Sequence, residues 1–358
     1  MPSSTGVTAL FEQLAHPIVQ APMAGGASTP ALAAAVCDAG GLGFLAAGYK
    51  SPGALREEIR QVRALTSRPF GVNLFLPQPP AADPGAVAAY ARRIAPEAAA
   101  YGVALGDAHQ ATDDGYDAKF AALLDDPVAV VSFTFGCPSR TAVDALAAVG
   151  TATVVTVTSA AEARAAHRAG ADAVCVQGVE AGGHQGTHHD DVRADRPGAG
   201  TGLLALLAEV RESVPLPVIA AGGLMRGGQI AAVLAAGACA AQLGTAFLPC
   251  PESGAHPVHK SALTDPAFPG TELTRAFSGR PARGLVNRFL REHGPAAPAA
   301  YPQVHHLTSP LRRAAAAAGD AGALNLWAGQ GHRLARTLPA AELVAVLAAE
   351  LRATRESE

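Results

Sequence analysis

The sequence has few of the features that mark nucleic-acid-binding, membrane or secreted proteins. Charged residues make up 16% of its 358 residues, the net charge is −3, and Lys and Arg form no concentrated run. Nucleic acid and anionic membranes are therefore not expected as main partners. No apolar stretch is both long enough and free enough of Gly and charge to span a bilayer, and residues 1–5 lack the segments of a secretory signal. These absences predict a cytoplasmic protein.

Cysteine and metal motifs are also missing. The five cysteines contain no CxxC pair, so reduced and mostly packed thiols are the simplest interpretation. Cys137, which follows a predicted strand, is the one cysteine placed to meet a ligand, yet we expect it to be a small buried hydrophobe. The run at 187–191 is rich in His and Asp, but adjacent residues on one loop do not easily converge on one ion. No metal site is predicted.

What the chain does contain is a regular alternation of short apolar runs with Ala-rich segments of helical spacing. The predicted strands cover residues 18–21, 43–46, 70–74, 128–133, 153–157, 173–177, 218–221 and 240–243. The predicted helices cover residues 29–39, 52–65, 139–148, 160–169, 203–210 and 228–236. The strands are apolar throughout, which is typical of a parallel sheet covered by helices. About eight such units favour an α/β fold of the (β/α)8 TIM-barrel type over an open sheet.

Two regions interrupt this alternation. Residues 76–126 form a long connection that we expect to hold the third barrel helix and extra turns. The segment 249–310 is rich in Pro, Gly and Arg and predicts a small appended cap, after which the Ala-rich tail returns to helix. We therefore predict a ligand-binding barrel over 1–250, a cap and substrate region over 251–309, and C-terminal helices over 310–358 that pack back on the barrel.

The most informative stretch is the loop Ala181-Gly182-Gly183-His184-Gln185-Gly186, which follows a predicted buried strand. Glycines allow backbone N–H groups to approach a ligand closely, and an imidazole supplies an acid/base group near neutral pH. The next two strands also end in glycine, at Gly222-Gly223 and at Gly244-Thr245. Since the carboxyl ends of barrel strands share one rim, the three glycine-bearing ends predict one phosphate-bearing ligand.

The chain resembles the nitronate monooxygenase family, once called 2-nitropropane dioxygenases. The resemblance rests on an ordered set of motifs that covers nearly the whole chain. The motifs are PIVQAPMAGG from Pro17, AGGLG from Ala39, PFGVNLF from Pro69, QGVEAGGH from Gln177, AGG from Ala221, QLGT from Gln242, SGRPAR from Ser278 and LWAGQG from Leu326. The same superfamily includes FMN-dependent enoyl-thioester reductases.

The resemblance implies a barrel that binds FMN without a covalent bond and oxidises alkyl nitronates with O2 to a carbonyl compound and nitrite. It implies that Pro22, Met23 and Ala24 lie against the flavin ring and that Asn73 and Gln177 bond its polar edge. It assigns the remaining cofactor contacts, mostly to the phosphate, to Gly182, Gly183, Gly222, Gly223, Gln242, Gly244 and Thr245.

The resemblance also identifies His184 as the catalytic histidine. As a cation or N–H donor it would hold the nitro group near the flavin, and as a neutral base it could remove the α-proton of a nitroalkane. A nitronate or nitro compound and O2 are then the expected partners, and a homodimer is left open.

Two other functions stay open from the sequence alone. An FMN-dependent NAD(P)H reductase, acting on enoyl thioesters or quinones, would share the barrel and the Gly-Gly-His loop. The absence of a GxGxxG fingerprint after a strand disfavours a dedicated dinucleotide site. A non-catalytic flavin-binding protein is the third alternative, and it would not need His184.

Some further residues have both a structural and a functional interpretation. Arg275, Arg280, Arg283 and Arg288 are expected either on a solvated face or in contacts between cap and barrel. Tyr301 is a candidate for the pocket mouth. The pocket walls are expected to come from the cap and from the loop at 187–200.

Overall fold

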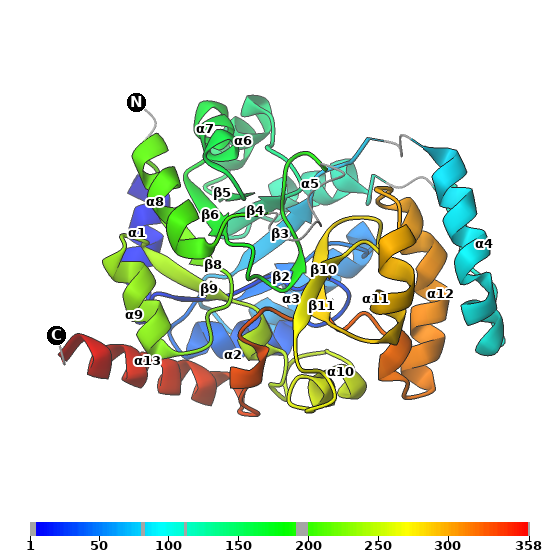
Figure 1. The fold of residues 1–358 in the computed structure, drawn as a ribbon. Coiled ribbons are helices and arrows are strands. Elements are labelled where there is room, and N and C mark those ends of the chain that lie inside the picture. The colour runs from blue at the N-terminus through cyan, green and yellow to red at the C-terminus, as the bar shows by residue number, and fades with distance from the viewer. Residues whose placement is uncertain (1–4, 80–82, 111–112, 191–199, 357–358) are drawn as a thin grey trace.

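A computed structural model of the chain describes residues 5–79, 83–110, 113–190 and 200–356. Its centre is a barrel of eight parallel strands (Figure 1). These are β1 (Ile18–Gln20), β2 (Phe44–Ala46), β3 (Gly71–Phe75), β4 (Val130–Thr134), β5 (Ala152–Val157), β6 (Ala173–Gln177), β8 (Val218–Ala221) and β9 (Ala240–Leu243). The expected (β/α)8 fold is thus confirmed, with each strand within two residues of its predicted bounds.

The barrel closes between its first two strands. The sheet order is β1-β9-β8-β6-β5-β4-β3-β2, and a parallel bridge joins Val19 to Leu42 just before β2. The backbone N–H of Gln20 donates to the carbonyl of Leu42 at 2.9 Å, and the N–H of Leu42 donates to the carbonyl of Ile18 at 3.0 Å. Closure brings the carboxyl ends of all eight strands to one rim.

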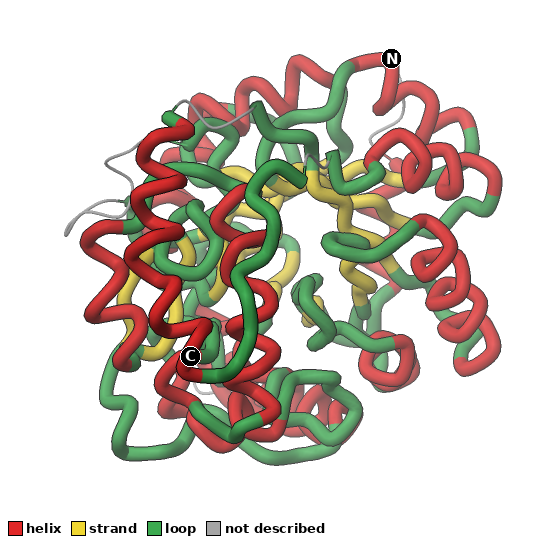
Figure 2. Tube along the Cα trace, turned by 90° about the vertical axis from the view of Figure 1, so that its right-hand side faces the viewer, coloured by secondary structure: helices red, strands yellow, loops and turns green. Residues whose placement is uncertain are grey.

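Helices surround the strands, as the tube in Figure 2 shows with red helices outside the yellow strands. The helices of the barrel layer are α2 (Pro30–Asp38), α3 (Pro52–Leu65), α5 (Tyr116–Asp125), α6 (Arg140–Ala148), α7 (Ala160–Ala169), α8 (Leu203–Ser213), α9 (Gly227–Ala235) and α13 (Ala340–Glu356). Several begin at a Ser or Thr whose hydroxyl accepts a backbone N–H of the first turn, for example Thr29 before α2 and Ser139 before α6. On α1 (Thr5–Gln13), Val7 and Phe11 pack with Phe44 and Val130 of the barrel.

The long connection between β3 and β4 holds two helices with different neighbours. α5 packs against α3 and β3, as the third barrel helix should. α4 (Pro84–Ala100) instead packs against α12 (Gln303–Ala317), at the right of Figure 1. There its Tyr90 lies in one apolar cluster with Phe277 and Phe289. A segment from the first third of the chain therefore joins the region after the barrel.

The region after β9 contains helices and a hairpin. Its elements are α10 (Pro257–Ala262), β10 (Thr271–Thr274), β11 (Ala282–Leu285) and α11 (Arg288–His293), followed by α12. The predicted boundary at 309–310 falls inside α12, and the division into three regions stays a prediction. α13 packs against α9 and α2 of the barrel. None of the helices in the described part of the chain is long and apolar enough to cross a membrane.

A second, small sheet connects this region to the barrel. The two-residue strand β7 (Gly183–His184) pairs antiparallel with β11, with His184 opposite Ala282 and Gly183 opposite Arg283. β11 in turn pairs with β10. The Gly-Gly-His loop therefore adds a third strand to the β10–β11 hairpin, which lies about a hundred residues later in the chain.

Candidate active site

A cavity of about 490 Å³ opens at the carboxyl ends of the barrel strands. All thirteen residues that the sequence singled out line it. They are Pro22, Met23, Ala24, Asn73, Gln177, Gly182, Gly183, His184, Gly222, Gly223, Gln242, Gly244 and Thr245. The structure thus brings the predicted site residues together, while their individual roles stay predictions.

The loop after β1 is fixed by a buried glutamine. Gln20 accepts the N–H of Phe44 at 3.0 Å through Oε1 and donates to the hydroxyl of Ser28 at 3.0 Å through Nε2. The same hydroxyl accepts the N–H of Met23 at 2.9 Å. These bonds hold the backbone from Pro22 to Ala24 in place along one side of the cavity.

The ends of β8 and β9 present free backbone donors. Among the residues described, no hydrogen-bond partner is found for the backbone N–H groups of Gly222, Gly223, Gly244 and Thr245. Gly222 and Gly223 have φ of +130° and +68°, which side chains other than hydrogen rarely allow. Four unpaired donors at adjacent strand ends suit a phosphate, because an anion satisfies them without a protein acceptor. The hydroxyl of Thr245 accepts the N–H of Gly329 at 2.9 Å and keeps its own hydrogen for a ligand.

Asn73 and Gln177 are both held by their neighbours. Asn73 Nδ2 donates to the Ser132 hydroxyl at 2.9 Å and to the Thr134 hydroxyl at 3.0 Å. Gln177 accepts the N–H of Gly186 at 2.7 Å and donates to the carbonyl of His184 at 3.1 Å. Through these two hydrogen bonds Gln177 holds the loop that carries His184, a role that the sequence did not indicate.

His184 stands at the cavity wall among aromatic side chains. Its ring centroid lies 5.6 Å from those of Phe135 and Tyr301 and 5.7 Å from that of Trp327. Burial, with the charges of Arg280 and Arg312 nearby, lowers the pKa of His184 to about 3. The ring is therefore neutral at physiological pH while no anion is bound, which disfavours the expected imidazolium and favours the neutral donor or base.

Ser278 is the polar partner of this neutral ring. His184 Nε2 lies 2.9 Å from the Ser278 hydroxyl, which also lies 3.2 Å from the carbonyl of Arg280. A hydroxyl has one hydrogen, so when Ser278 donates it to Arg280, the hydroxyl accepts from His184 and Nε2 carries the proton. In that tautomer Nδ1 is the unprotonated nitrogen, the one able to accept a proton.

The cavity also has lining residues that sequence reasoning did not select. These are Tyr49, Phe75, Phe135, His259, His305, Ser309, Arg312 and Trp327. Ser278 and Trp327 belong to two of the motifs that the chain shares with the family, SGRPAR and LWAGQG. Tyr49, His305 and Arg312 belong to no such motif, and their spacing in the sequence does not indicate a site. Tyr301, expected at the mouth, instead lies behind the lining and donates its hydroxyl to that of Tyr49 at 3.1 Å. Cys175, and not Cys137, is the cysteine at the cavity.

Three of the four arginines of interest make cap–barrel contacts. Arg275, Arg280 and Arg283 are only 2%, 1% and 6% exposed, so they do not form a solvated face. Arg280 donates to Gln78 Oε1 at 2.8 Å and to the carbonyl of Thr187, and it lies 4.2 Å above the Phe135 ring. Only Arg288 lies at the surface, where it pairs with Glu97 at 2.6 Å.

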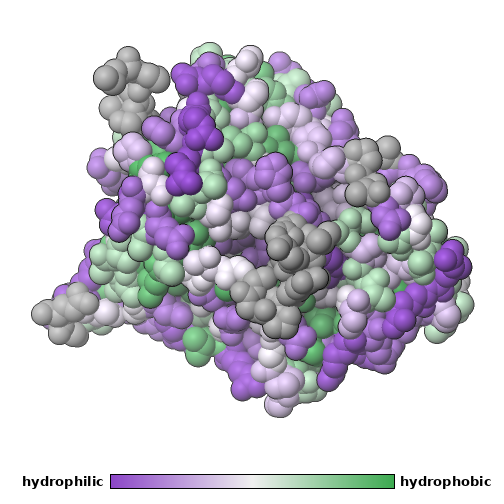
Figure 3. Space-filling model, turned by 45° about the horizontal axis from the view of Figure 1, so that its top comes forward, coloured by the Kyte–Doolittle hydropathy of each residue, from purple (hydrophilic) through white to green (hydrophobic). Residues whose placement is uncertain are grey.

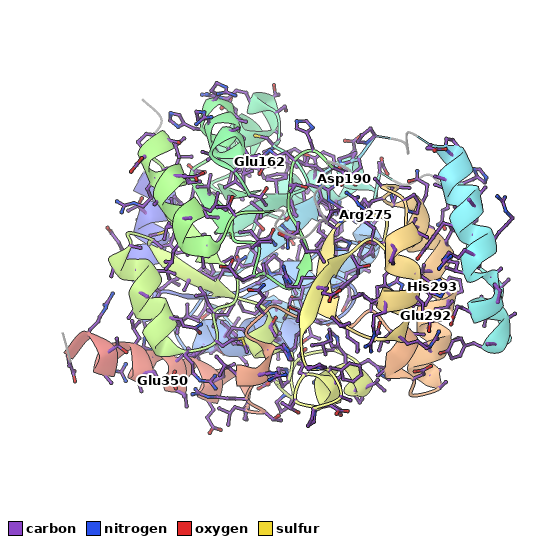
Figure 4. The ribbon with its side chains drawn as sticks, viewed as in Figure 1. Glu162, Asp190, Arg275, Glu292, His293 and Glu350 are labelled. Atoms are coloured by element: carbon purple, nitrogen blue, oxygen red, sulfur yellow. The ribbon has the colours of Figure 1, made fainter. Side chains whose placement is uncertain are left out.

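The His/Asp-rich run does not gather around one point. The backbone N–H of His188 donates to Glu162 at 2.8 Å, and its ring Nε2 lies 3.0 Å from the carbonyl of Thr156. Asp190 pairs with Arg275 at 2.7 Å, side by side in Figure 4. Asp191 and most of the loop at 187–200 lie outside the described residues.

The face shown in Figure 3 has hydrophilic and hydrophobic residues interspersed.

A closed parallel barrel whose strand ends surround a cavity with free N–H groups and a half-buried histidine places the chain among α/β-barrel proteins with a ligand site at the rim. The sequence profile of the nitronate monooxygenase family matches residues 8–350. A nitronate monooxygenase of Pseudomonas aeruginosa is 45% identical over 94% of this chain and 96% of its own length. The chain belongs to the nitronate monooxygenase family, which is a family of flavoenzymes, and the expected resemblance is confirmed.

Solved structures agree with this assignment. A nitroalkane oxidase from Streptomyces ansochromogenes is 66% identical and superposes with a TM-score of 0.95, covering 98% of this chain and 99% of its own. FabK from Thermotoga maritima is 31% identical, with a TM-score of 0.75 over 98% of this chain and 97% of its own. The chain is therefore similar over nearly its whole length both to this nitroalkane oxidase and to FabK.

Proposed function

We propose that the protein is an FMN-dependent enzyme that oxidises alkyl nitronates with O2. The overall reaction balances when two nitronate anions and one O2 give two carbonyl compounds and two nitrite ions. The observation that carries the proposal is His184, neutral and half-buried at the cavity wall of a chain that belongs to the nitronate monooxygenase family.

The residues at the rim fit FMN. The unpaired N–H groups of Gly222, Gly223, Gly244 and Thr245 would hold its phosphate. The fixed backbone of Pro22, Met23 and Ala24 would lie against its ring, and Asn73 within β3 and Gln177 at the end of β6 would face its polar edge. When bound, FMN supplies the electron-transfer chemistry, and the protein positions the reactants.

His184 would bind and orient the substrate. Ser278 holds the ring at Nε2, and in the tautomer with its proton on Nε2 the free Nδ1 would take the α-proton when the substrate arrives as a nitroalkane. For a nitronate, which has already lost that proton, an anion next to the ring would raise the pKa of His184 and favour a charged hydrogen bond to it. The surrounding aromatic rings keep water away from this contact.

The alternative is an FMN-dependent NAD(P)H reductase of the same superfamily. The likeness to FabK fits only this second function, and its TM-score of 0.75 is lower than the 0.95 of the nitroalkane oxidase. Among the described residues, no other feature of the cavity favours it over nitronate oxidation.

The test is a product assay on the purified protein reconstituted with FMN. With the nitronate of nitroethane and O2, we expect acetaldehyde and nitrite in equal amounts. His184→Asn should reduce kcat/KM by about 10²-fold or more while flavin stays bound, which is the size of a lost acid/base or hydrogen-bonding group. His167→Asn, at an exposed position on α7, is the matched control and should not change the rate.

Two results would count against the proposal. Oxidation of NADPH by a quinone or an enoyl thioester, without nitrite from the nitronate, would establish the reductase. Equal rates of nitrite formation by wild type and His184→Asn would show that His184 takes no part in the reaction.

A further inference from the structure

An ion pair with one fully buried partner lies behind the cavity, outside its lining. Lys119 on α5 has a side chain that is only 1% exposed, and its Nζ lies 2.8 Å from Oδ2 of the half-buried Asp114. Neither residue lines the cavity. Taking charges out of water costs desolvation energy that their attraction often fails to recover. The pair is therefore better explained by what it positions than by a contribution to stability.

The second oxygen of Asp114 holds the backbone of Tyr49. Asp114 Oδ1 accepts the N–H of Tyr49 at 2.9 Å. Tyr49 has φ of +67°, and Asp114 itself has φ of +58°. Residues with large side chains rarely adopt this left-handed conformation unless their surroundings enforce it. The carboxylate of Asp114 is the group that does so for Tyr49, and Lys119 opposes the burial that would otherwise raise the pKa of this carboxyl further.

Tyr49 links the ion pair to side chains at the cavity. Its ring stacks on His305 with centroids 4.0 Å apart and an interplanar angle of 8°, and it meets Phe75 edge-on at 5.6 Å. Its hydroxyl accepts a hydrogen bond from Tyr301, whose ring lies 5.6 Å from that of His184. We call Tyr49, Tyr301 and His305 the aromatic cluster. A continuous set of contacts thus runs from Lys119 to the side chains next to His184.

We propose that Asp114 and Lys119 are positioning residues that set substrate affinity by holding Tyr49, and with it the aromatic cluster, without touching the substrate. The proposal rests on the proposed function in that His184 marks the place of the reacting group. It predicts an effect on KM more than on kcat, because His184 has its own supports in Ser278 and Gln177.

The experiment compares three variants with a control in the FMN-loaded enzyme. Asp114→Ala removes both the charge and the acceptor for Tyr49. The double variant Asp114→Asn with Lys119→Met removes both charges and keeps an amide oxygen that can accept the N–H of Tyr49. Tyr49→Phe removes only the hydroxyl bond to Tyr301. The control is Glu58→Gln, which breaks the neighbouring Lys50–Glu58 pair (2.6 Å) and leaves the bonds of Tyr49 intact.

With the nitronate of nitroethane as substrate, Asp114→Ala should raise KM about tenfold while kcat stays within about twofold, since displaced binding groups cost affinity and position. The double variant should recover most of the affinity, and Tyr49→Phe should show an intermediate KM. FMN affinity should be unchanged in all of them. Hydrogen exchange of the peptide that contains Tyr49 should be faster in Asp114→Ala, and close to wild type in the double variant and in Glu58→Gln.

Equal KM values for Asp114→Ala and Glu58→Gln would overturn the proposal. A parallel loss of kcat, KM and FMN affinity would also overturn it, because that pattern indicates general damage to the fold. If the wild type does not turn over nitronates at all, the proposed function fails. In that case the rate of hydrogen exchange of the peptide that contains Tyr49, compared between wild type and Asp114→Ala, tests the positioning of Tyr49 independently of turnover.

Discussion

At the scale of single residues, the chemistry of the site depends on the charge of His184. Its ring is neutral because protein atoms replace water around it and because two guanidinium groups, Arg280 and Arg312, lie close. The only polar partner found for the ring among the described residues is Ser278, whose hydroxyl lies 2.9 Å from Nε2. The same surroundings that keep the ring neutral would stabilise an anion placed beside it.

This neutrality predicts a pH dependence of stability. The pKa of His184 is lowered from 6.5 in the unfolded chain to about 3 in the folded one. Between these values the unfolded state binds a proton that the folded state does not, so His184 reduces stability as the pH falls from 6.5 toward 3 and has no effect above 6.5. From pH 7 to pH 5, wild type should therefore lose about 1 kcal/mol or more of unfolding free energy relative to His184→Asn. Denaturant unfolding of both proteins at the two pH values measures this, and parallel pH dependences would show that His184 is solvated.

Most of the candidate site could be predicted at this scale, for a topological reason. Residues that end parallel strands must share one rim, so Gln177, Gly222 and Gly244 could be placed together before any contact was known. Asn73 lies within β3 (Gly71–Phe75) and lines the same cavity. Their bonds could not be predicted. Gln177 holds the His184 loop because of the path that the loop takes, and Tyr49, His305 and Arg312 reach the cavity through tertiary packing that leaves no periodic pattern.

At the scale of elements, the Gly-Gly-His loop depends on two segments far away in sequence. One is β11, which pairs with β7 and so orients His184. The other is the segment around Ala328 and Gly329, whose backbone passes close to Gly182. A Cβ on Gly182 would lie 2.4 Å from the N of Gly329 and 2.5 Å from the carbonyl carbon of Ala328, closer than atoms can approach.

Gly182→Ala should therefore push these two segments apart. We expect it to lower stability by about 1–3 kcal/mol, as overpacking does, and to weaken FMN binding about tenfold or more, because the segments flank the predicted phosphate site. Gly270→Ala is the matched control, since nothing lies within 4 Å of its added Cβ, and surface changes of this kind stay within about 0.5 kcal/mol. Flavin fluorescence titration and denaturant unfolding measure both effects. Equal behaviour of the two variants would show that the approach at Gly182 is not required.

The elements differ in how well the sequence predicted them. Strands and helices of the barrel have strong apolar patterns and well-marked caps, and their bounds agree within a few residues. β7 could not be predicted, because a strand of two residues is too short to show an alternation of polar and apolar side chains. Its pairing partner is a hairpin about a hundred residues later in the sequence. The packing of α4 against α12 could not be predicted either, since an amphipathic helix does not specify its partner.

At the scale of the whole molecule, the barrel provides the rim and the later segments complete the site. The free N–H groups come from β8 and β9, and the aromatic cluster comes from the loop after β2 and from the segment at 301–305. Buried arginines such as Arg280 tie the two parts together, donating to Gln78 and Thr187. A barrel without the later segments would therefore keep the phosphate donors and lose Ser278, Tyr301 and Trp327 from the surroundings of His184.

The central claim is that this cavity holds a flavin that reacts with a nitronate. The most direct test is the visible absorbance of the purified, FMN-loaded protein under anaerobic conditions, before and after the nitronate of nitroethane is added. We expect the bands of oxidised flavin to disappear on addition and to return when O2 is admitted, with nitrite released. Bands that stay unchanged with nitronate but disappear with NADPH, or a protein that binds no flavin, would contradict it.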